Sequence, residues 1–309
     1  MKTFEEIYEN IINKNGEELN KAVKELKNKN KKLAITTLII CLIIDIIYII
    51  LKINKNLYTI MFTILINLII IVISSVISIT AKERKKYLEL YKKRIIKSII
   101  DNFYNNVKYL PFDKMPENIY KEVNYENYNK YYSDDYFIGL IDNKNKIEMA
   151  EVVTKEERTY EESEGNTKSQ DILKFKGLFS KIEIEKSIEN ELQISKNNKS
   201  KRNKVEMDSQ EFEKSFDVNC TNKIVAMQIL TADIMEELIS FKEKYKIEYD
   251  IYIKNNIIYL RFHCGNMFEA GNLKKGIVDK NLLEKYFNIL NFTYKVSNKL
   301  IKTINDTEI

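Results

Sequence analysis

Two adjacent carboxylates, Asp134 and Asp135, could do chemistry, and they stand directly before a predicted strand. Paired carboxylates can bind a cation or share acid–base work. Asp is also common in turns, where its side chain bonds nearby backbone groups, and we expect this structural role here. Glu269 is a third carboxylate that an enzyme could use. Clustering of the three in one pocket would favour an enzyme, and scatter over the surface would disfavour one.

The chain is poor in thiol and imidazole groups, with 3 Cys and 1 His. His263 and Cys264 are neighbours on a predicted strand, so their side chains should point to opposite faces. Joint metal coordination or a Cys–His catalytic pair would then need Cys220 to approach His263. No phosphate-binding loop or nucleophile elbow is found in the sequence. We therefore expect no metal site, no cofactor and no catalytic residue, and the chain is predicted not to be an enzyme.

The charge of the 309-residue chain is unevenly distributed. Its formal net charge of +5 arises from residues 1–100, whereas residues 101–309 are mildly acidic. The 20 tyrosines could form a stacking platform for single-stranded nucleic acid, but that mode also needs a positive groove. We expect no nucleic-acid partner. The 7 Gly and 2 Pro exclude a collagen-like or Pro/Gly-rich disordered chain.

Two apolar runs, residues 33–51 and 57–79, dominate the N-terminal third of the chain. Each is close to the roughly 20 residues that cross a bilayer, and the link of residues 52–56 is short. The runs therefore predict a two-helix transmembrane hairpin. Basic residues flank the hairpin far more than they populate its link, which predicts a multi-pass protein of the cell membrane with both termini in the cytoplasm. The flanking basic residues expected to meet the anionic headgroups of a lipid bilayer are Lys31, Lys32, Lys82, Arg84, Lys85 and Lys86.

Two polar residues, Asp45 and Asn67, interrupt the apolar runs. The carboxyl group of Asp45, deep within a predicted membrane span, suggests a proton or ion relay. The alternative is a polar clamp between the two helices, or between two copies of the chain in a homo-oligomer. We expect the clamp, because two helices alone enclose no pathway.

The remaining sequence predicts helices beside the hairpin and a domain beyond it. Apolar residues at helical spacing predict a cytoplasmic amphipathic helix over residues 1–32, interrupted at Gly16, and a helical stalk over residues 80–106. Residues 118–304 predict a cytoplasmic α+β domain with a mostly antiparallel sheet and flanking helices. The expected features of this domain are strands at 136–141, 147–153 and 172–184, a loop at 154–170, a helix at 231–244, a hairpin turning at 255–256 and a helix at 280–304.

Several stretches of this domain resemble an uncharacterised bacterial family, the domain of unknown function numbered 3137. They are the FKGLF element of residues 175–179, MDSQEFEKSFDV of residues 207–218, AMQILTADIMEEL of residues 226–238, and Phe268-Glu269. The resemblance covers roughly residues 131–300. It implies an N-terminal pair of membrane spans, as members of that family typically carry, and it implies no activity or catalytic residues.

These observations lead to a membrane-anchored cytoplasmic binding or scaffolding module that recruits or senses a protein partner. Two alternatives stay open. One is a membrane-tethered enzyme that uses Asp134, Asp135 or Glu269. The other is a small transport or channel subunit centred on Asp45.

Overall fold

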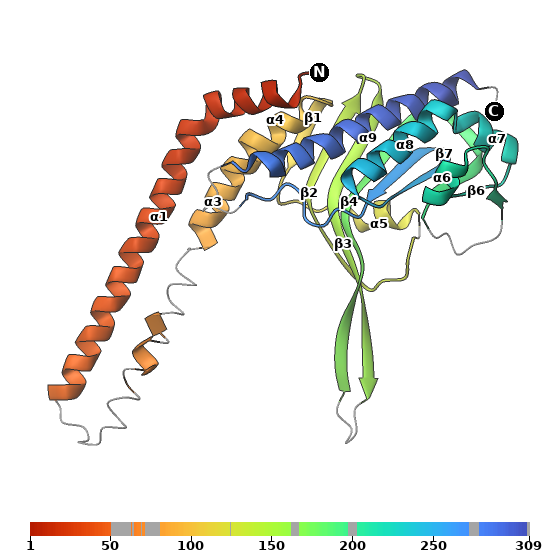
Figure 1. The fold of residues 1–309 in the computed structure, drawn as a ribbon. Helices are drawn as coiled ribbons and strands as arrows, with labels where there is room; N and C mark the ends of the chain where they lie inside the picture. The colour runs from red at the N-terminus through yellow and green to blue at the C-terminus, as the bar shows by residue number, and fades with distance from the viewer. Residues whose placement is uncertain are drawn as a thin grey trace. The chain divides into compact units, whose positions relative to one another are not determined.

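The computed structural model describes residues 1–50, 63, 65–68, 70–71, 81–123, 125–161, 167–196, 203–271 and 278–307 (Figure 1). They fall into two units, which are described separately. The helical unit comprises Tyr8–Ile95 and Ala270–Asp279, and the α+β unit comprises Met1–Ile7, Ile96–Glu269 and Lys280–Ile309.

The helical unit is built on α1 (Phe4–Ile50), α3 (Ala81–Tyr91) and the π-helix η1 (Lys92–Ile96). Apolar side chains recurring at helical spacing are buried on both α1 and α3. Arg94 Nε lies 3.7 Å from Glu18 Oε2, which links η1 to α1. The predicted interruption at Gly16 is wrong, because α1 passes through this residue. The buried residues of these helices include Ile11, Leu19, Val23, Leu26, Tyr87, Tyr91 and Ile95.

The predicted transmembrane hairpin is contradicted by the structure. Among the described residues, no helix offers an apolar stretch long enough to cross a bilayer. The sequence predicts a separate span at 33–51, whereas the structure makes residues 33–50 the last part of the 47-residue α1, whose earlier turns are rich in charged residues. Most of the run at 57–79 lies outside the described residues. The prediction of a multi-pass membrane protein with both termini in the cytoplasm is therefore also contradicted, because it depended on this hairpin.

The later turns of α1 carry large apolar side chains that are about half exposed. Patches of this kind are unusual on a single folded chain. Nothing in the described residues shows what covers them. They include Ile35, Leu38, Ile39, Ile40, Leu42, Ile43, Ile44 and Ile46.

The α+β unit contains helices on both sides of an antiparallel sheet. Its helices are α4 (Lys97–Ile100), α5 (Glu117–Lys121), α6 (Gln210–Ser215), α7 (Lys223–Ile229), α8 (Ala232–Tyr245) and α9 (Lys280–Asp306). Its strands are β1 (Asn105–Leu110), β2 (Lys130–Ile141), β3 (Asn145–Glu161), β4 (Thr167–Ser195), β5 (Lys204–Val205), β6 (Asp217–Cys220) and β7 (Tyr249–Phe262).

Among the described residues, seven strands form one sheet in the order β1-β2-β3-β4-β6-β5, and β7 pairs with β4. Every pairing is antiparallel, as the sequence predicted. β7 folds back on itself, because the backbone N–H of His263 donates to the carbonyl oxygen of Glu248 (2.8 Å). Asn255 has a φ of 54° at the predicted turn, where Asn tolerates the left-handed region. The predicted hairpin at 255–256 is therefore confirmed.

The two halves of β4 pair with opposite halves of β7. Residues 178–183 of β4 pair with 257–262, and residues 192–194 pair with 251–253. The β7 hairpin is therefore inserted between the two halves of the long strand β4. This order joins segments that lie far apart in the sequence, which local patterns cannot predict.

The predicted loop at 154–170 is instead a two-stranded arm. Glu161 of β3 pairs with Thr167 of β4, and the pairing continues back to the main sheet. Figure 1 shows this arm extending from the body of the sheet. Polar side chains of the two strands pair with one another, as in the ion pair of Lys155 Nζ with Asp171 Oδ2 at 3.2 Å. The sequence of the arm lacks the alternation of apolar and polar residues that marks a strand, because neither face of the arm is buried.

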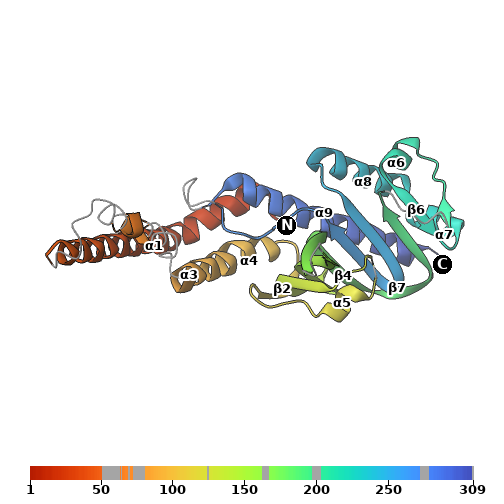
Figure 2. The same ribbon diagram turned by 90° about the horizontal axis from the view of Figure 1, so that it is seen from below.

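Helices α8 and α9 lie against one face of the sheet (Figures 1 and 2). Phe292 of α9 stacks on Phe241 of α8 with ring centroids 3.8 Å apart and also contacts Phe262 of β7. The opposite face carries α5, whose Tyr120 packs against Phe179 of β4. The sheet therefore has an apolar layer on each side.

A buried ion network lies on the α5 face of the β7 hairpin. Arg261 Nη2 lies 2.8 Å from Asp250 Oδ2, and Arg261 also pairs with Glu126. The guanidinium stands 3.8 Å from the centroid of the Tyr125 ring, a cation–π geometry. The network ties residues 125–126 to the centre of the sheet.

Candidate cation site

A β-bulge in β2 brings two neighbouring carboxylates to one place. Asp134 pairs with Glu151 of β3, but the next register pair is Phe137 with Met149, so β2 contains one extra residue. Asp135 occupies the bulge with a φ of 53°. In a regular strand, adjacent side chains point to opposite faces, and a bulge changes this alternation.

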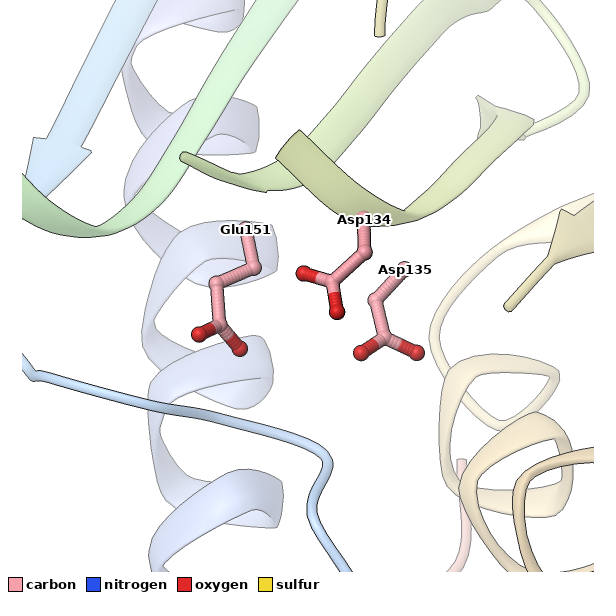
Figure 3. A group of neighbouring side chains, drawn as sticks. All are labelled: Asp134, Asp135 and Glu151. Carbon is pink, nitrogen blue, oxygen red and sulfur yellow. The ribbon is translucent and has the colours of Figure 1, made fainter. Parts of the chain in front are cut away.

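The three carboxylates Asp134, Asp135 and Glu151 converge (Figure 3). One oxygen from each lies within 4.8 Å of the others. Asp135 and Glu151 are buried, with 0% and 5% of their surface exposed, whereas Asp134 is partly exposed. This is therefore a buried group of acids rather than an ordinary acidic surface.

Burial and neighbouring acids together change the protonation of Glu151. Burial raises its pKa to about 8, and the charges of Asp134, Asp135 and Glu269 act in the same direction. The backbone N–H of Met267 donates to Glu151 Oε2 (2.8 Å), which opposes this rise by stabilising the carboxylate. Glu151 consequently holds a proton at neutral pH when no cation is nearby.

Two tyrosines border the cluster. The Tyr109 hydroxyl of β1 bonds to Asp135, and burial together with that carboxylate raises the pKa of Tyr109 well above its ordinary value. The Tyr286 hydroxyl of α9 donates to the backbone oxygen of Glu269 (3.2 Å). The tyrosines hold one carboxylate and one loop in position, and both remain protonated.

Glu269 lies beside the same cluster, in the segment that follows β7. Its charge raises the pKa of Glu151 and also that of Tyr109. Asp134, Asp135 and Glu269 were singled out from the sequence, and the structure brings them together. Glu151 was missed because it looks like one polar residue within an alternating strand. Its place opposite Asp134 depends on the register of β2 and β3.

The spacing of the carboxylates suits a divalent cation. Ca²⁺ takes oxygen ligands at about 2.3–2.6 Å, so oxygens on opposite sides of the ion are up to about 5 Å apart. The 4.8 Å limit within the cluster falls inside this range. Mg²⁺ takes ligands at about 2.0–2.1 Å and demands near-octahedral geometry, so it needs oxygens no more than about 4.2 Å apart.

The thiols and the imidazole form no comparable group within the described part of the chain. His263 Nε2 lies 3.2 Å from Asp250 Oδ2, beside the buried ion network. Cys264 and Cys220 are buried free thiols. Burial raises the pKa of Cys264 to about 11, so this thiol is a poor nucleophile and a poor metal ligand.

The residues predicted for membrane contacts belong to the helical unit. The side chain of Asp45 lies outside the described ones. Asn67 is buried, and its carbonyl oxygen lies 3.9 Å from the Sγ of Cys41. Lys31, Lys32, Lys85 and Lys86 are exposed, and the side chains of Lys82 and Arg84 also lie outside the described ones.

Fold and site define an antiparallel α+β domain with a buried carboxylate cluster. Residues 173–302 match the family described as "Protein of unknown function (DUF3137)", which confirms the resemblance. The matched segment includes Glu269, whereas Asp134, Asp135 and Glu151 lie before it.

A solved structure shows a weak likeness to this chain. The crystal structure of the mycobacterial trehalose monomycolate transport factor A, TtfA, aligns over 67% of this chain and 92% of its own, at a TM-score of 0.33 and 9% identity. No curated protein matches the chain.

Proposed function

We propose that the α+β unit is a binding module that holds a divalent cation between Asp134, Asp135 and Glu151. The observation that carries this proposal is the convergence of three carboxylates within 4.8 Å, two of them buried. Buried acids at this separation repel one another when ionised. Protons or a cation can offset this repulsion, and one divalent ion placed between the three carboxylates would offset two of their three charges.

Cation and proton compete for Glu151. Its pKa of about 8 means that most Glu151 carboxyls are protonated at neutral pH without a cation. Because metal ligands must be deprotonated, binding releases this proton. Affinity should therefore rise as the pH increases from about 6 to about 8, and level off above the pKa.

Calorimetric titration of the full chain with CaCl₂, MnCl₂ and MgCl₂ at pH 7 and pH 8.5 tests the proposal. We expect saturable binding of one Ca²⁺ or Mn²⁺, tighter at the higher pH, and weaker binding of Mg²⁺. Asp134→Asn and Glu151→Gln should abolish binding. Glu183→Gln alters a half-exposed carboxylate of β4 and serves as the matched control.

Absence of binding at both pH values would contradict the proposal. Equal binding by Glu151→Gln and the unsubstituted chain would also contradict it. Circular dichroism of each variant separates loss of ligands from loss of fold.

A carboxylate-dependent enzyme is the second candidate function. It is favoured by Glu151, whose pKa of about 8 lies where a general acid or base works at neutral pH. Hydrolysis of p-nitrophenyl phosphate and p-nitrophenyl acetate by the full chain would test it. We expect any true turnover to follow the ionisation of Glu151 and to disappear in Glu151→Gln. A background rate that is unchanged in Glu151→Gln would rule out this role for the residue.

A further inference from the structure

The arm formed by β3 and β4 leaves one edge of β4 without a neighbouring strand. Residues 167–173 of β4 pair with residues 155–161 of β3, whereas the pairing of β4 with β7 begins only at Leu178. Within the described ranges, no strand pairs with residues 167–173 on the side away from β3. We call this side of residues 167–173 the outer edge of the arm. An open strand edge can pair with a strand of another chain.

Hydrogen bonds at the base of the arm show which backbone groups point to the outer edge. The backbone N–H of Glu157 donates to Asn129 Oδ1 (2.8 Å), and Asn129 Nδ2 donates to the carbonyl oxygen of Glu157 (3.1 Å). Both backbone groups of Glu157 therefore point away from β4. Because Asp171 lies opposite Glu157, its own N–H and C=O must point away from β3, and the same holds for every second residue of this antiparallel ladder. The outward-facing residues of β4 are Thr167, Ser169, Asp171 and Leu173.

The outer edge is accessible and carries an apolar side chain. Ser169 and Asp171 are exposed, and 55% of the surface of Leu173 is accessible. A two-stranded ribbon is only marginally stable by itself in water. A further strand at the outer edge would pair the outward-facing backbone groups and cover Leu173.

The segment 167–173 is complementary to itself in one antiparallel register. If two copies meet around a two-fold axis at Gln170, all four outward-facing residues are paired, with Ser169 of each copy opposite Asp171 of the other. Lys168 then lies opposite Ile172, so no like charges are directly opposed. An axis one residue further along would instead place the Asp171 side chains of the two copies face to face.

From this geometry we infer that two copies of the chain associate through the outer edges of their arms. The product is a four-stranded antiparallel ribbon in the order β3-β4-β4-β3, held by backbone hydrogen bonds between the two β4 strands. The register of β3 with β4 shifts between Lys155 opposite Leu173 and Thr154 opposite Phe175. This irregularity ends the regular outer edge, so the pairing between copies has a defined length. The inference is independent of the cation site.

Sedimentation velocity of the full chain over about a hundredfold range of concentration measures this self-association. Ser169→Pro removes an outward-facing N–H, and Pro is tolerated at this edge because no bond to β3 is lost. Thr159→Pro is the matched control, since Thr159 lies opposite Ser169 and its backbone groups face the other edge of the arm. Circular dichroism confirms that both variants fold.

A disulfide tests the register directly. At the two-fold axis the residues at position 170 of both copies have Cβ atoms roughly 4.5–5.5 Å apart, close to the distance that a disulfide spans. Gln170→Cys should therefore form a linked dimer on mild oxidation. Lys168→Cys is the control, because two exposed residues at position 168 lie about 13 Å apart along the paired strands. The three native cysteines are buried, and the unsubstituted chain measures their background.

We expect the unsubstituted chain to form a dimer whose fraction rises with concentration. Ser169→Pro removes one hydrogen bond from each copy and should weaken the dimer at least about tenfold, whereas Thr159→Pro should leave it unchanged. Gln170→Cys should be crosslinked much faster than Lys168→Cys. A monomer at every concentration, equal effects of the two Pro variants, or equal crosslinking of the two Cys variants would overturn the inference.

Discussion

Asp134 and Glu151 stand directly opposite each other on the antiparallel strands β2 and β3. Like charges in such a cross-strand pair destabilise a sheet by roughly 0.2–1 kcal/mol even when they are exposed. Here Glu151 is buried and Asp135 adds a third carboxylate. A proton on Glu151, whose pKa is raised to about 8, offsets part of this repulsion.

The first prediction concerns the pH dependence of stability without added metal. The pKa of Glu151 is about 8 in the folded chain and about 4.5 when the group is unperturbed. A carboxyl whose pKa is raised by folding holds its proton more tightly in the folded state. The contribution of Glu151 to the stability of the folded chain is complete below about pH 4.5 and is lost as the pH rises through 8. We expect the free energy of unfolding to fall across this range by an amount on the order of 5 kcal/mol.

Glu151→Gln supplies the control for this pH dependence. The amide is neutral at every pH, so the free energy of unfolding of the variant should lack the part of the pH dependence that comes from Glu151. Urea unfolding at pH 5, 6.5 and 8.5 measures it. The same slope in both proteins would show that Glu151 is not protonated in the folded chain.

The second prediction concerns Gly177, in the FKGLF element. A Cβ built on Gly177 would lie 1.8 Å from the carbonyl oxygen of Phe262, because β4 and β7 approach each other closely there. Gly177→Ala must therefore separate two paired strands, and we expect a loss of more than about 3 kcal/mol of stability, or no folded protein.

Gly16→Ala is the matched control for Gly177→Ala. Within α1, a Cβ at Gly16 meets only the side chain of Ile12 at an ordinary 3.8 Å. Ala is favoured over Gly inside a helix by about 1 kcal/mol, so this variant should be neutral or more stable. Thermal unfolding followed by circular dichroism compares the two. Equal behaviour of both variants would contradict the close approach of β4 and β7.

The third prediction concerns Arg261. Arg261→Met leaves Asp250 and Glu126 without their buried guanidinium, and removing one partner of a buried ion network costs about 3–5 kcal/mol. The exposed ion pair of Lys254 with Glu191 offers a comparison. Lys254→Met should cost less than about 1 kcal/mol. Urea unfolding of the two variants measures the difference, and a similar small loss in both would mean that the Arg261 network is dispensable.

The fourth prediction concerns the thiols. Cys41, Cys220 and Cys264 are all buried in the folded chain. Burial also raises the pKa of Cys220 and of Cys264, which lowers their thiolate fraction. At pH 8 we expect dithionitrobenzoate to react slowly with the native protein and rapidly with all three thiols in urea. Rapid stoichiometric reaction of the native protein would contradict the burial.

Local patterns predicted the parts of the domain whose residues alternate between a buried and an exposed face. They located the long helix that became α9 and the hairpin at 255–256, because amphipathic periodicity and turn-forming Asn residues are local signals. They failed for the arm of β3 and β4, which buries neither face. They also failed for the run at 33–51, because hydropathy alone does not show that α1 begins at Phe4 and passes into that run.

The sequence by itself determined the antiparallel α+β character of the domain, the family of residues 173–302 and the presence of two adjacent acids before a strand. Only the tertiary structure decided that these acids form a cluster. One extra residue at Asp135 changes the alternation of β2, the register with β3 places Glu151 opposite Asp134, and the chain returns after β7 to bring Glu269 alongside. Such pairings join residues far apart in sequence, and they are set by the packing of the whole sheet rather than by any local pattern.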